Sequence, residues 1–145
     1  MQIKITTDYA IRSILYLATH KGVVNAQEIG ENMGIPGGYI TKVLRSLRVA
    51  GIVSSMKGGD GGYMLMRTPE QITMQDIVAA MEKTVRINRC LEDDGFCSRH
   101  AAASCPVHDY YCGLQRMLDD YLSGTTVQDI LDYNCGVRKH YRKPE

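Results

Sequence analysis

Five cysteines, all in the second half of this 145-residue chain, are the residues whose chemistry follows most directly from the sequence. They are Cys90, Cys97, Cys105, Cys112 and Cys135. Six residues separate the first two cysteines, and seven separate the second from the third. The odd number of thiols argues against a secreted disulfide framework, as does an N-terminus without the apolar run of a signal peptide. In a reducing compartment, clustered cysteines more often bind a metal or take part in redox chemistry.

The first three of these cysteines are candidate metal ligands, because thiolates are soft ligands that suit iron–sulfur clusters and zinc. We favour an iron–sulfur cluster. Zinc, a cluster-free thiol or disulfide switch, and cysteines buried as small hydrophobic residues are the alternatives. The surrounding segment is polar and rich in aspartate, which argues against burial. We interpret Cys135 as a free thiol without an assigned function.

A cluster normally needs a fourth ligand, and spacing alone offers Cys112. If a helix includes Cys105, then Cys105, His108 and Cys112 lie at positions i, i+3 and i+7 on one helical face. The same residues permit a different hypothesis, a thiol enzyme in which Cys97 or Cys105 is paired with His100 or His108. Catalysis needs a pocket and an oriented base, and no sequence signal indicates a pocket. We therefore do not expect an enzyme.

The elements that position the cysteines are predicted to be mainly α-helical. Apolar periodicity and capping residues predict helices at about 7–19, from Asn25 to Gly34, at about 36–50, after Thr73, at about 106–122 and at about 126–133. Asn25, Thr73 and Thr126 each precede an acidic residue at the position that completes a capping box: Glu28, Asp76 and Asp129. Residues 85–105 show no clear period, and a loop of this length is usually functional or disordered.

Two short helices joined by the sequence Gly-Ile-Pro at residues 34–36 predict a helix-turn-helix. After Gly51, residues 52–56 and 63–67 read as two short strands. The connection at residues 57–62 holds four glycines, which permit positive φ and a close approach of the backbone to another molecule. A hairpin directly after the third helix is a wing. The expected fold is therefore mainly α: a winged helix-turn-helix with a two-stranded wing, plus a long dimerisation helix.

One face of the third helix has the residues that a helix in the DNA major groove needs. Opposite its core stripe lie Gly38, Lys42 and Arg45, flanked by Tyr39, Thr41 and Arg48. The wing adds Lys57 and Gly58 as expected contacts, the lysine along a neighbouring minor groove. A solvated basic face is the simpler interpretation of the helix alone, but a helix of this kind followed by a wing favours binding to double-stranded DNA.

The long helix predicted from Pro106 carries apolar residues at steps of four and three, which is typical of a dimer seam. The expected seam consists of Val107, Tyr111, Leu114, Leu118 and Tyr121. The chain then divides into a winged helix-turn-helix DNA-binding domain at 1–83 and a cysteine-containing sensor loop at 84–105. The dimerisation helix and a short C-terminal helix occupy 106–133, and a basic mobile tail occupies 134–145.

Charge is distributed unevenly along the chain. Residues 1–67 hold eight lysines and arginines against four acidic residues, whereas residues 68–145 hold nine against twelve. A basic first half is consistent with an anion-binding module. No segment approaches the ~18 consecutive apolar residues that a membrane span requires. We therefore expect a cytoplasmic protein that does not bind membranes.

Several segments resemble the IscR/NsrR-type winged-helix transcription regulators, the Rrf2 family. The similarity covers about residues 1–133, and its most specific piece is the Gly-Gly-Tyr end of the wing. The matching segments are residues 7–12, 15–18, 47–53, 55–63, 72–77 and 126–131. Two features depart from the usual pattern: Lys57 stands where many relatives have arginine, and the gaps between the three cysteines are slightly longer.

The resemblance implies a homodimer that binds a palindromic operator and regulates transcription, which we expect to be repression. Some members hold an iron–sulfur cluster, [2Fe-2S] or [4Fe-4S], that reports iron–sulfur supply, redox state or nitric oxide. Others lack a cluster and respond to a partner protein or metabolite. The resemblance also implies two further candidates for the fourth ligand: His108, which we favour, and Asp8 of the partner subunit. Asp8 has a simpler role as a first-turn carboxylate favoured by the helix dipole.

Overall fold

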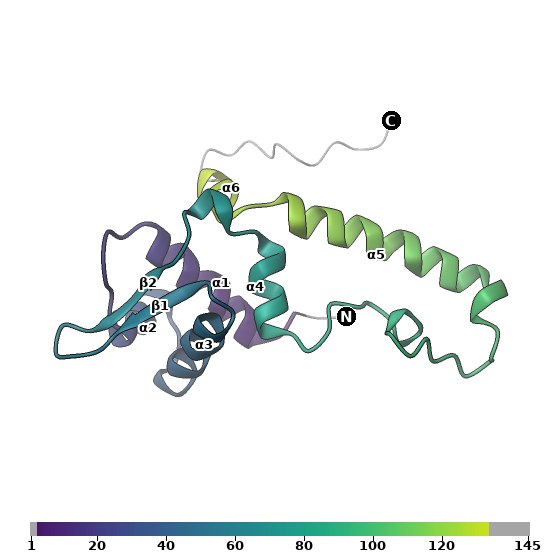
Figure 1. Cartoon of the computed structure of the whole chain (residues 1–145), viewed down its shortest axis with the longest axis horizontal. Coiled ribbons are helices and arrows are strands. Elements are labelled where there is room, and N and C mark those ends of the chain that lie inside the picture. Colours follow the sequence, from purple (N-terminus) through teal and green to yellow (C-terminus); the bar gives the residue numbers. More distant parts are fainter. Residues whose placement is uncertain (1–2, 134–145) are drawn as a thin grey trace.

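The computed structural model describes residues 3–133, so the predicted tail at 134–145 and Cys135 lie outside the described residues. The described part contains six α-helices and one two-stranded antiparallel sheet (Figure 1). The helices are α1 (Ile5–Ala18), α2 (Ala26–Met33), α3 (Gly37–Val49), α4 (Met74–Met81), α5 (Pro106–Gly124) and α6 (Val127–Asp132). The strands are β1 (Val53–Met56) and β2 (Gly62–Leu65). The predicted winged helix-turn-helix with a separate long helix is confirmed.

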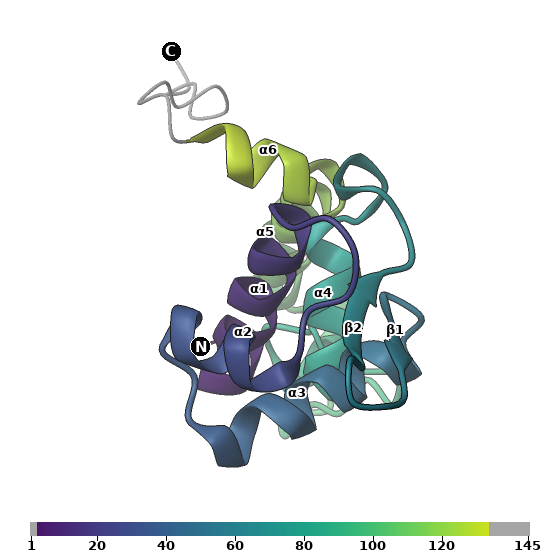
Figure 2. The same cartoon turned by 90° about the vertical axis from the view of Figure 1, so that its left-hand side faces the viewer.

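One apolar core lies among α1, α2, α3, α4 and the base of the hairpin (Figure 2). Its largest members are aliphatic, as expected for a chain without tryptophan and with a single phenylalanine. The core includes the predicted stripe of α3: Ile40, Val43, Leu44 and Leu47. This core holds α3 and the wing in one rigid unit, because close-packed side chains leave little room for relative movement.

The ends of the helices follow the predicted caps with two differences. Thr73 and Thr126 form complete capping boxes with the third residue of their helices. Asn25 caps α2, but the Glu28 carboxylate does not return to it and instead accepts a hydrogen bond from the Tyr16 hydroxyl at 3.0 Å. Helix α1 begins at Ile5, two residues earlier than predicted, because the Lys4 carbonyl accepts from the Thr7 and Asp8 amides.

The wing is a four-residue hairpin whose register pairs Val53 with Leu65 and Met56 with Gly62. Its second strand also forms a bridge to the α1–α2 connection: the Tyr63 amide donates to the Val24 carbonyl at 2.8 Å, and the Val24 amide donates back at 2.9 Å. One edge of β2 therefore pairs with β1, and its other edge attaches the wing to the body of the domain.

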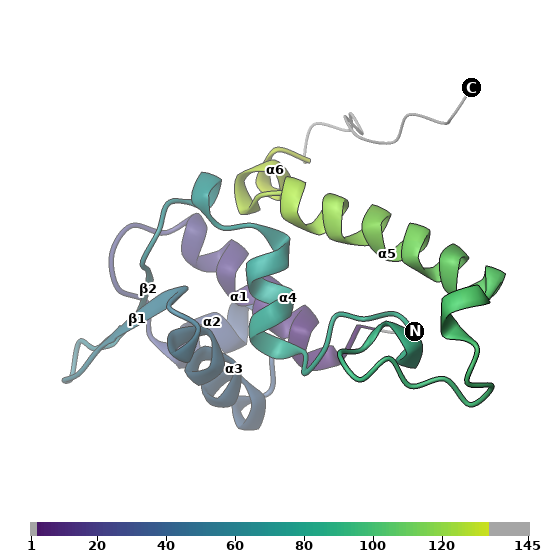
Figure 3. The ribbon, with the colours of Figure 1, turned by 45° about the vertical axis from the view of Figure 1, so that its right-hand side comes forward.

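Helix α5 extends away from the core, with its first turn at the far end (Figures 1 and 3). Residues 82–105 lead outward from α4 to that far end through two short 3-10 helices, η2 (Arg89–Leu91) and η3 (Ala102–Ser104). The helix α5 then returns the chain to the core, where α6 packs on α1. The outgoing segment lies beneath α5, and η2 contacts it.

Three of the five residues of the predicted seam of α5, Val107, Leu114 and Tyr121, are exposed in the single chain. Tyr111 and Leu118 are half-buried, so they are not on the most exposed face. The exposed stripe instead uses Tyr110 and Met117, which are 67% and 71% exposed. We define the α5 stripe as Val107, Tyr110, Leu114, Met117 and Tyr121. No helix of the described residues is long and apolar enough to cross a membrane.

Candidate functional site

The outer face of α3 presents all the residues that the sequence predicted for it. Gly38, Thr41, Lys42, Arg45 and Arg48 are exposed, as is Tyr39. Helix α3 contains no acidic residue, and its first turn carries Gly37 and Gly38, so that backbone N–H groups at the helix N-terminus are open to an anion. This face can therefore approach a polyanion closely.

The positive charges of this face are available for an external partner. Within the described residues, no carboxylate pairs with Lys42, Arg45 or Lys57. Arg48 donates a hydrogen bond from Nη1 to the Ser55 hydroxyl at 3.2 Å, which links the end of α3 to β1. Lys57 and Gly58 lie at the exposed tip of the hairpin, where Gly58 has a φ of +115° that only glycine adopts readily. We define the α3–wing face as these four basic residues with Gly38, Tyr39, Thr41 and Gly58.

The start of α3 contacts α1 through an aromatic pair that the sequence did not reveal. The Tyr39 ring meets the Tyr9 ring edge to face at 5.6 Å, and the Arg12 guanidinium lies 5.7 Å from the Tyr9 ring centre. Arg12 also forms an ion pair with Asp8 at 2.5 Å. Asp8 is thus a first-turn carboxylate of α1 with a partner in its own chain, which agrees with its simpler predicted role.

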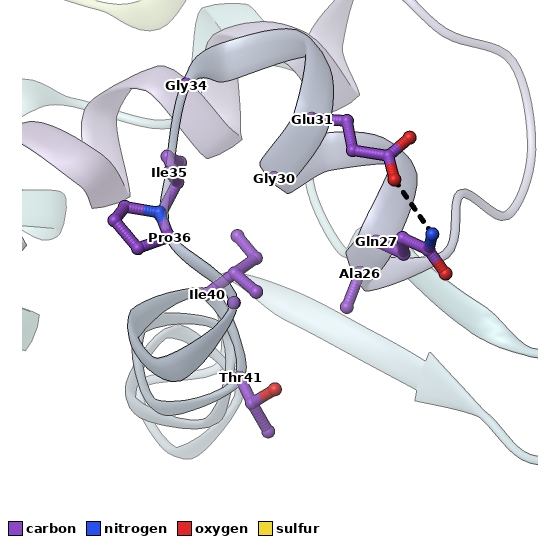
Figure 4. A pocket seen from close by; sticks show the side chains of 10 residues that line it. Ala26, Gln27, Gly30, Glu31, Gly34, Ile35, Pro36, Ile40 and Thr41 are labelled. Carbon is purple, nitrogen blue, oxygen red and sulfur yellow. Dashed lines mark hydrogen bonds between the residues drawn. The ribbon is translucent and has the colours of Figure 1, made fainter.

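A groove of about 690 Å³ runs between α2 and the start of α3 (Figure 4). Ile35, Pro36 and Ile40 line its inner side, and Gln27 lies on the facing helix α2, where its amide donates to Glu31 at 2.8 Å. Gly30 also lines the groove. A Cβ at this position would lie only 3.1 Å from the Ile35 carbonyl oxygen, so α2 and the turn before α3 approach closely here. The groove is the concave side of the helix-turn-helix, and it leaves the N-terminal turn of α3 accessible.

The four described cysteines, Cys90, Cys97, Cys105 and Cys112, are reduced and half-exposed, which is inconsistent with their being buried hydrophobic residues. Cys90 lies in η2, Cys97 in the irregular part of the segment, and Cys105 is the residue that precedes α5. Among the described residues, no three His, Cys, Asp or Glu side chains gather closely enough to hold a metal ion. The single chain therefore places the candidate ligands along one segment without assembling them.

Cys97 lies in a turn whose backbone stabilises a thiolate. Backbone N–H groups of residues 99–101, with that of Ala101 contributing most, donate to its sulfur and lower the pKa of Cys97 below its ordinary value. The nearby charge of Arg99 acts in the same direction, whereas partial burial opposes it. His100 adopts a φ of +52°, which turns successive amides toward one point. Hydrogen bonds of this kind are also found around metal-bound thiolates, so the environment of Cys97 fits a ligand.

His108 and Cys112 are the two candidate ligands that the structure brings together. The Nε2 atom of His108 lies 3.4 Å from the Cys112 sulfur, one helical turn along α5. The Nδ1 atom of the same ring is buried and has no hydrogen-bond partner. An unpartnered ring nitrogen can serve as a ligand while its other nitrogen is oriented by a neighbour. Three thiols and this imidazole are donors of the type that iron–sulfur clusters take, although the described chain does not bring them together.

Sequence reasoning missed one polar residue next to the cysteines. Gln115 is 4% exposed and hydrogen-bonds the peptide groups on both sides of Arg86. Periodicity could not single it out, because a glutamine in an otherwise polar helix gives no signal until the packing is known. The exposed Tyr110 and Met117 could have been found from the sequence, since each follows a predicted seam residue by three positions.

A family model described as Rrf2, iron-dependent transcriptional regulator, matches residues 3–133. A protein of Aquifex aeolicus assigned as an HTH-type transcriptional regulator is 32% identical over 128 residues, which are 88% of this chain and 89% of that protein. The HTH-type transcriptional regulator IscR of Aliivibrio salmonicida is 28% identical over 125 residues, covering 85% of this chain and 73% of that protein.

A solved structure with the same architecture is that of CymR (YrzC), the global cysteine regulator of B. subtilis. It superposes with a TM-score of 0.76 at 25% identity, and the match covers 92% of this chain and 98% of that chain. The similarity thus includes the winged domain together with the long helix α5, because both chains are covered almost completely.

Proposed function

The chain belongs to the Rrf2 family of transcriptional regulators, and we propose that it is a homodimeric repressor that senses iron–sulfur, redox or nitric oxide status through a cysteine-ligated cluster. Members of this family are DNA-binding proteins and are not enzymes. One observation carries the proposal: the chain combines an open cationic α3–wing face with a segment that contains several thiols. That segment ends at the first turn of α5, a helix with an exposed apolar stripe.

In this proposal the α3–wing face binds double-stranded DNA. Lys42 and Arg45 reach base edges or phosphates in the major groove, and Lys57 reaches the backbone or the minor groove next to it. Arg48 joins the helix to β1 through Ser55, so helix and wing meet the duplex as one surface. Residues 1–83 act as the DNA-binding domain, and residues 84–105 act as the sensor loop.

A second copy of the chain covers the α5 stripe. None of the apolar side chains of α5 is fully buried in the described chain, and the five stripe residues follow an alternating spacing of three and four residues. Such a stripe buries itself against an identical helix in a two-fold dimer. Two wings and two α3 helices are then presented to a palindromic operator, whose half-sites must lie ~34 Å apart on one face of the duplex.

Three thiolates and one imidazole hold the cluster: Cys90, Cys97, Cys105 and His108. When bound, the cluster supplies a redox-active centre whose state depends on iron–sulfur supply and on oxidants. Because Cys105 caps α5 and His108 lies in its first turn, gathering these residues acts directly on the dimer helix. A change in the angle between the two α5 helices changes the separation of the two α3 helices, and a shift of a few ångströms costs much of the affinity for a fixed operator.

Iron and sulfide analysis with a visible spectrum, on protein purified without oxygen, tests this function. The operator is first selected from random duplexes, and its affinity is then measured for the cluster-loaded and the chelator-stripped dimer. We expect iron and sulfide in the purified protein and a change of at least tenfold in operator affinity. Loaded and stripped protein that bind the operator equally would contradict the proposed switch.

The second candidate is a cluster-free regulator of the same fold, gated by thiol oxidation or by a partner protein or metabolite. The similarity to a cysteine regulator and the stabilised thiolate of Cys97 favour it. In the oxidative form, the Cys97 thiolate takes one oxygen atom from hydrogen peroxide, releases hydroxide and becomes a sulfenic acid. Colourless protein from oxygen-free cells, combined with a peroxide-dependent change in operator affinity that Cys97→Ser abolishes, would favour this candidate.

A further inference from the structure

Helix α5 has two opposite faces with different partners. One face carries the exposed α5 stripe. On the other face, Gln115 and Asp119 contact the sensor loop of the same chain. His108 and Cys112 lie along the same side of the helix. Cys105 is joined to α5 along the chain, whereas a movement of α5 can reach the beginning of the sensor loop, with Cys90, through the contacts of this second face.

Gln115 makes the most complete of these contacts. Its Oε1 accepts from the Ile87 amide at 2.9 Å, and its Nε2 donates to the Val85 carbonyl at 3.1 Å. The same Nε2 donates to Asp119 Oδ1 at 2.8 Å, and the other oxygen of Asp119 pairs with Arg86 at 3.4 Å. One turn of α5 thus holds residues 85–87 at three points. We define this set, residues 85–87 with Gln115 and Asp119, as the glutamine clamp.

The central residue of the clamp is buried, so its hydrogen bonds fix one position of the loop on α5. Gln115 is the one residue of α5 that is fully buried in the described chain, at 4% exposure. An amide at that depth is tolerated because its polar atoms are satisfied, and an apolar side chain of the same size would fill the space without fixing the loop. Its hydrogen bonds to a carbonyl and an amide two residues apart set the register of the loop along the helix.

The clamp lies between the sensor and the dimer helix. Cys90 follows Ile87 by three residues, and η2, which contains it, contacts α5. Cys112 precedes Gln115 by three residues on the same face of the helix. The beginning of the sensor loop therefore moves with α5, whereas no side-chain hydrogen bond within residues 3–133 joins the part of the loop around Cys97 to α5.

We infer that Gln115 is the positioning residue that couples the sensor loop to the dimerisation helix. It holds the peptide groups around Arg86 against α5, so that gathering Cys90 into a metal site displaces the helix instead of only the loop. This inference rests on the proposed cluster-dependent function. Without the clamp, gathering Cys90 would rearrange the loop without displacing α5, and the metal site would act on the helix only through Cys105 and His108 at its first turn.

The experiment compares Gln115→Met with Gln128→Met in the full-length dimer. Methionine keeps the volume of glutamine but makes no hydrogen bond. Gln128 is a matched control, because its amide donates to Asp132 at 2.9 Å in the same i, i+4 arrangement on α6, away from the loop. Two readouts are measured for each protein: amide hydrogen exchange of the chelator-stripped dimer, and the ratio of operator affinities between loaded and stripped dimer.

For Gln115→Met we expect roughly tenfold faster exchange at Ile87, since one hydrogen bond of ordinary strength is lost, with unchanged exchange at Leu44 and Leu47 in the core. We also expect the affinity ratio to fall toward one while the iron content stays as in the wild type. Gln128→Met should leave both readouts unchanged. Unchanged exchange at Ile87, an equal rise throughout the chain, or a wild-type affinity ratio in Gln115→Met would overturn the inference. If the loaded and stripped forms of the unmutated protein bound the operator equally, that result would contradict the proposed function itself.

Discussion

Glu82 connects the beginning of α1 to the end of α4, where the sensor loop begins. Its carboxylate accepts from the Lys4 amide at 3.3 Å and from the Thr7 hydroxyl at 2.5 Å, and it pairs with the Lys4 ammonium at 2.7 Å. Burial alone would raise the pKa of Glu82, but the hydrogen bonds from Lys4 and Thr7 and the lysine charge outweigh it and lower the pKa. The folded state therefore binds this proton more weakly than the unfolded state.

This difference predicts how stability depends on pH. A carboxylate with a lowered folded-state pKa contributes its full stabilisation above its unfolded pKa of about 4.3 and loses it as the pH falls through the folded pKa. We expect Glu82→Gln to be less stable by on the order of 1–2 kcal/mol near pH 7, with a difference that shrinks as the pH falls below about 5. Urea unfolding between pH 7 and pH 3 measures it, and a difference that grew on acidification would be the wrong sign.

The identity of the fourth ligand is also decided by single residues. His108 has an unpartnered, buried Nδ1, whereas Cys112 contacts its other ring nitrogen. We expect His108→Ala to lower iron content or change the visible spectrum, and Cys112→Ser to retain both, because a serine hydroxyl can still orient the ring. Iron and sulfide analysis on oxygen-free protein checks this. The opposite pattern, with loss in Cys112→Ser and retention in His108→Ala, would make Cys112 the ligand.

At the scale of elements, the wing depends on a backbone approach that leaves no space for a side chain. A Cβ on Gly62 would lie 2.3 Å from the Val24 carbonyl oxygen, across the bridge that holds β2 to the domain. We expect Gly62→Ala to destabilise the fold by on the order of 1–3 kcal/mol and to weaken DNA binding by displacing the wing. Gly59→Ala is the control, because nothing lies within 4 Å of a Cβ there.

Thermal unfolding and operator binding of the two alanine variants provide the measurement. Equal stability and equal affinity for both would show that the close approach of β2 to Val24 does not hold the wing in place. A loss of affinity in Gly59→Ala alone would instead place the constraint at the tip of the hairpin.

Local signals were sufficient to predict most of these elements. Caps at Thr73 and Thr126, the stripe of α3 and the glycine-rich hairpin depend on residues close in the chain, so sequence spacing reveals them. Contacts between distant segments were not predictable in this way. The register of α5 against its own loop depends on Gln115 meeting residues 85–87, and this contact determines which side of α5 remains exposed.

In the candidate site, too, the features set by local sequence were predicted and those set by distant contacts were not. The residues of the α3–wing face were predicted because one helix and one hairpin contain them all. The cysteines were found by type and spacing, but their mutual arrangement depends on the path of an irregular loop, which no periodicity describes. Hydrogen bonds to the Cys97 sulfur likewise arise from an unusual φ at His100, which its sequence context does not indicate.

At the scale of the whole molecule, the α5 stripe predicts the oligomeric state. Leu114 and Met117 are 40% and 71% exposed, so glutamate at either position can keep its charge in water in the single chain. We expect the double variant Leu114→Glu with Met117→Glu to sediment as a monomer, because two charges cannot be buried in an apolar seam. Arg116→Glu, an exposed position beside the stripe, should remain a dimer. A double variant that stays dimeric by sedimentation velocity would place the interface elsewhere.

The proposed function depends on the α3–wing face being the surface that binds duplex DNA. Its most direct test is equilibrium binding of the dimer to the selected operator at several salt concentrations, for wild type, for Lys42→Ala with Arg45→Ala, and for the control Arg116→Ala. We predict salt-sensitive binding by the wild type and the control, and at least tenfold weaker binding with a shallower salt dependence in the double variant, because phosphate contacts are lost. Equal affinity and equal salt dependence in all three proteins would contradict it.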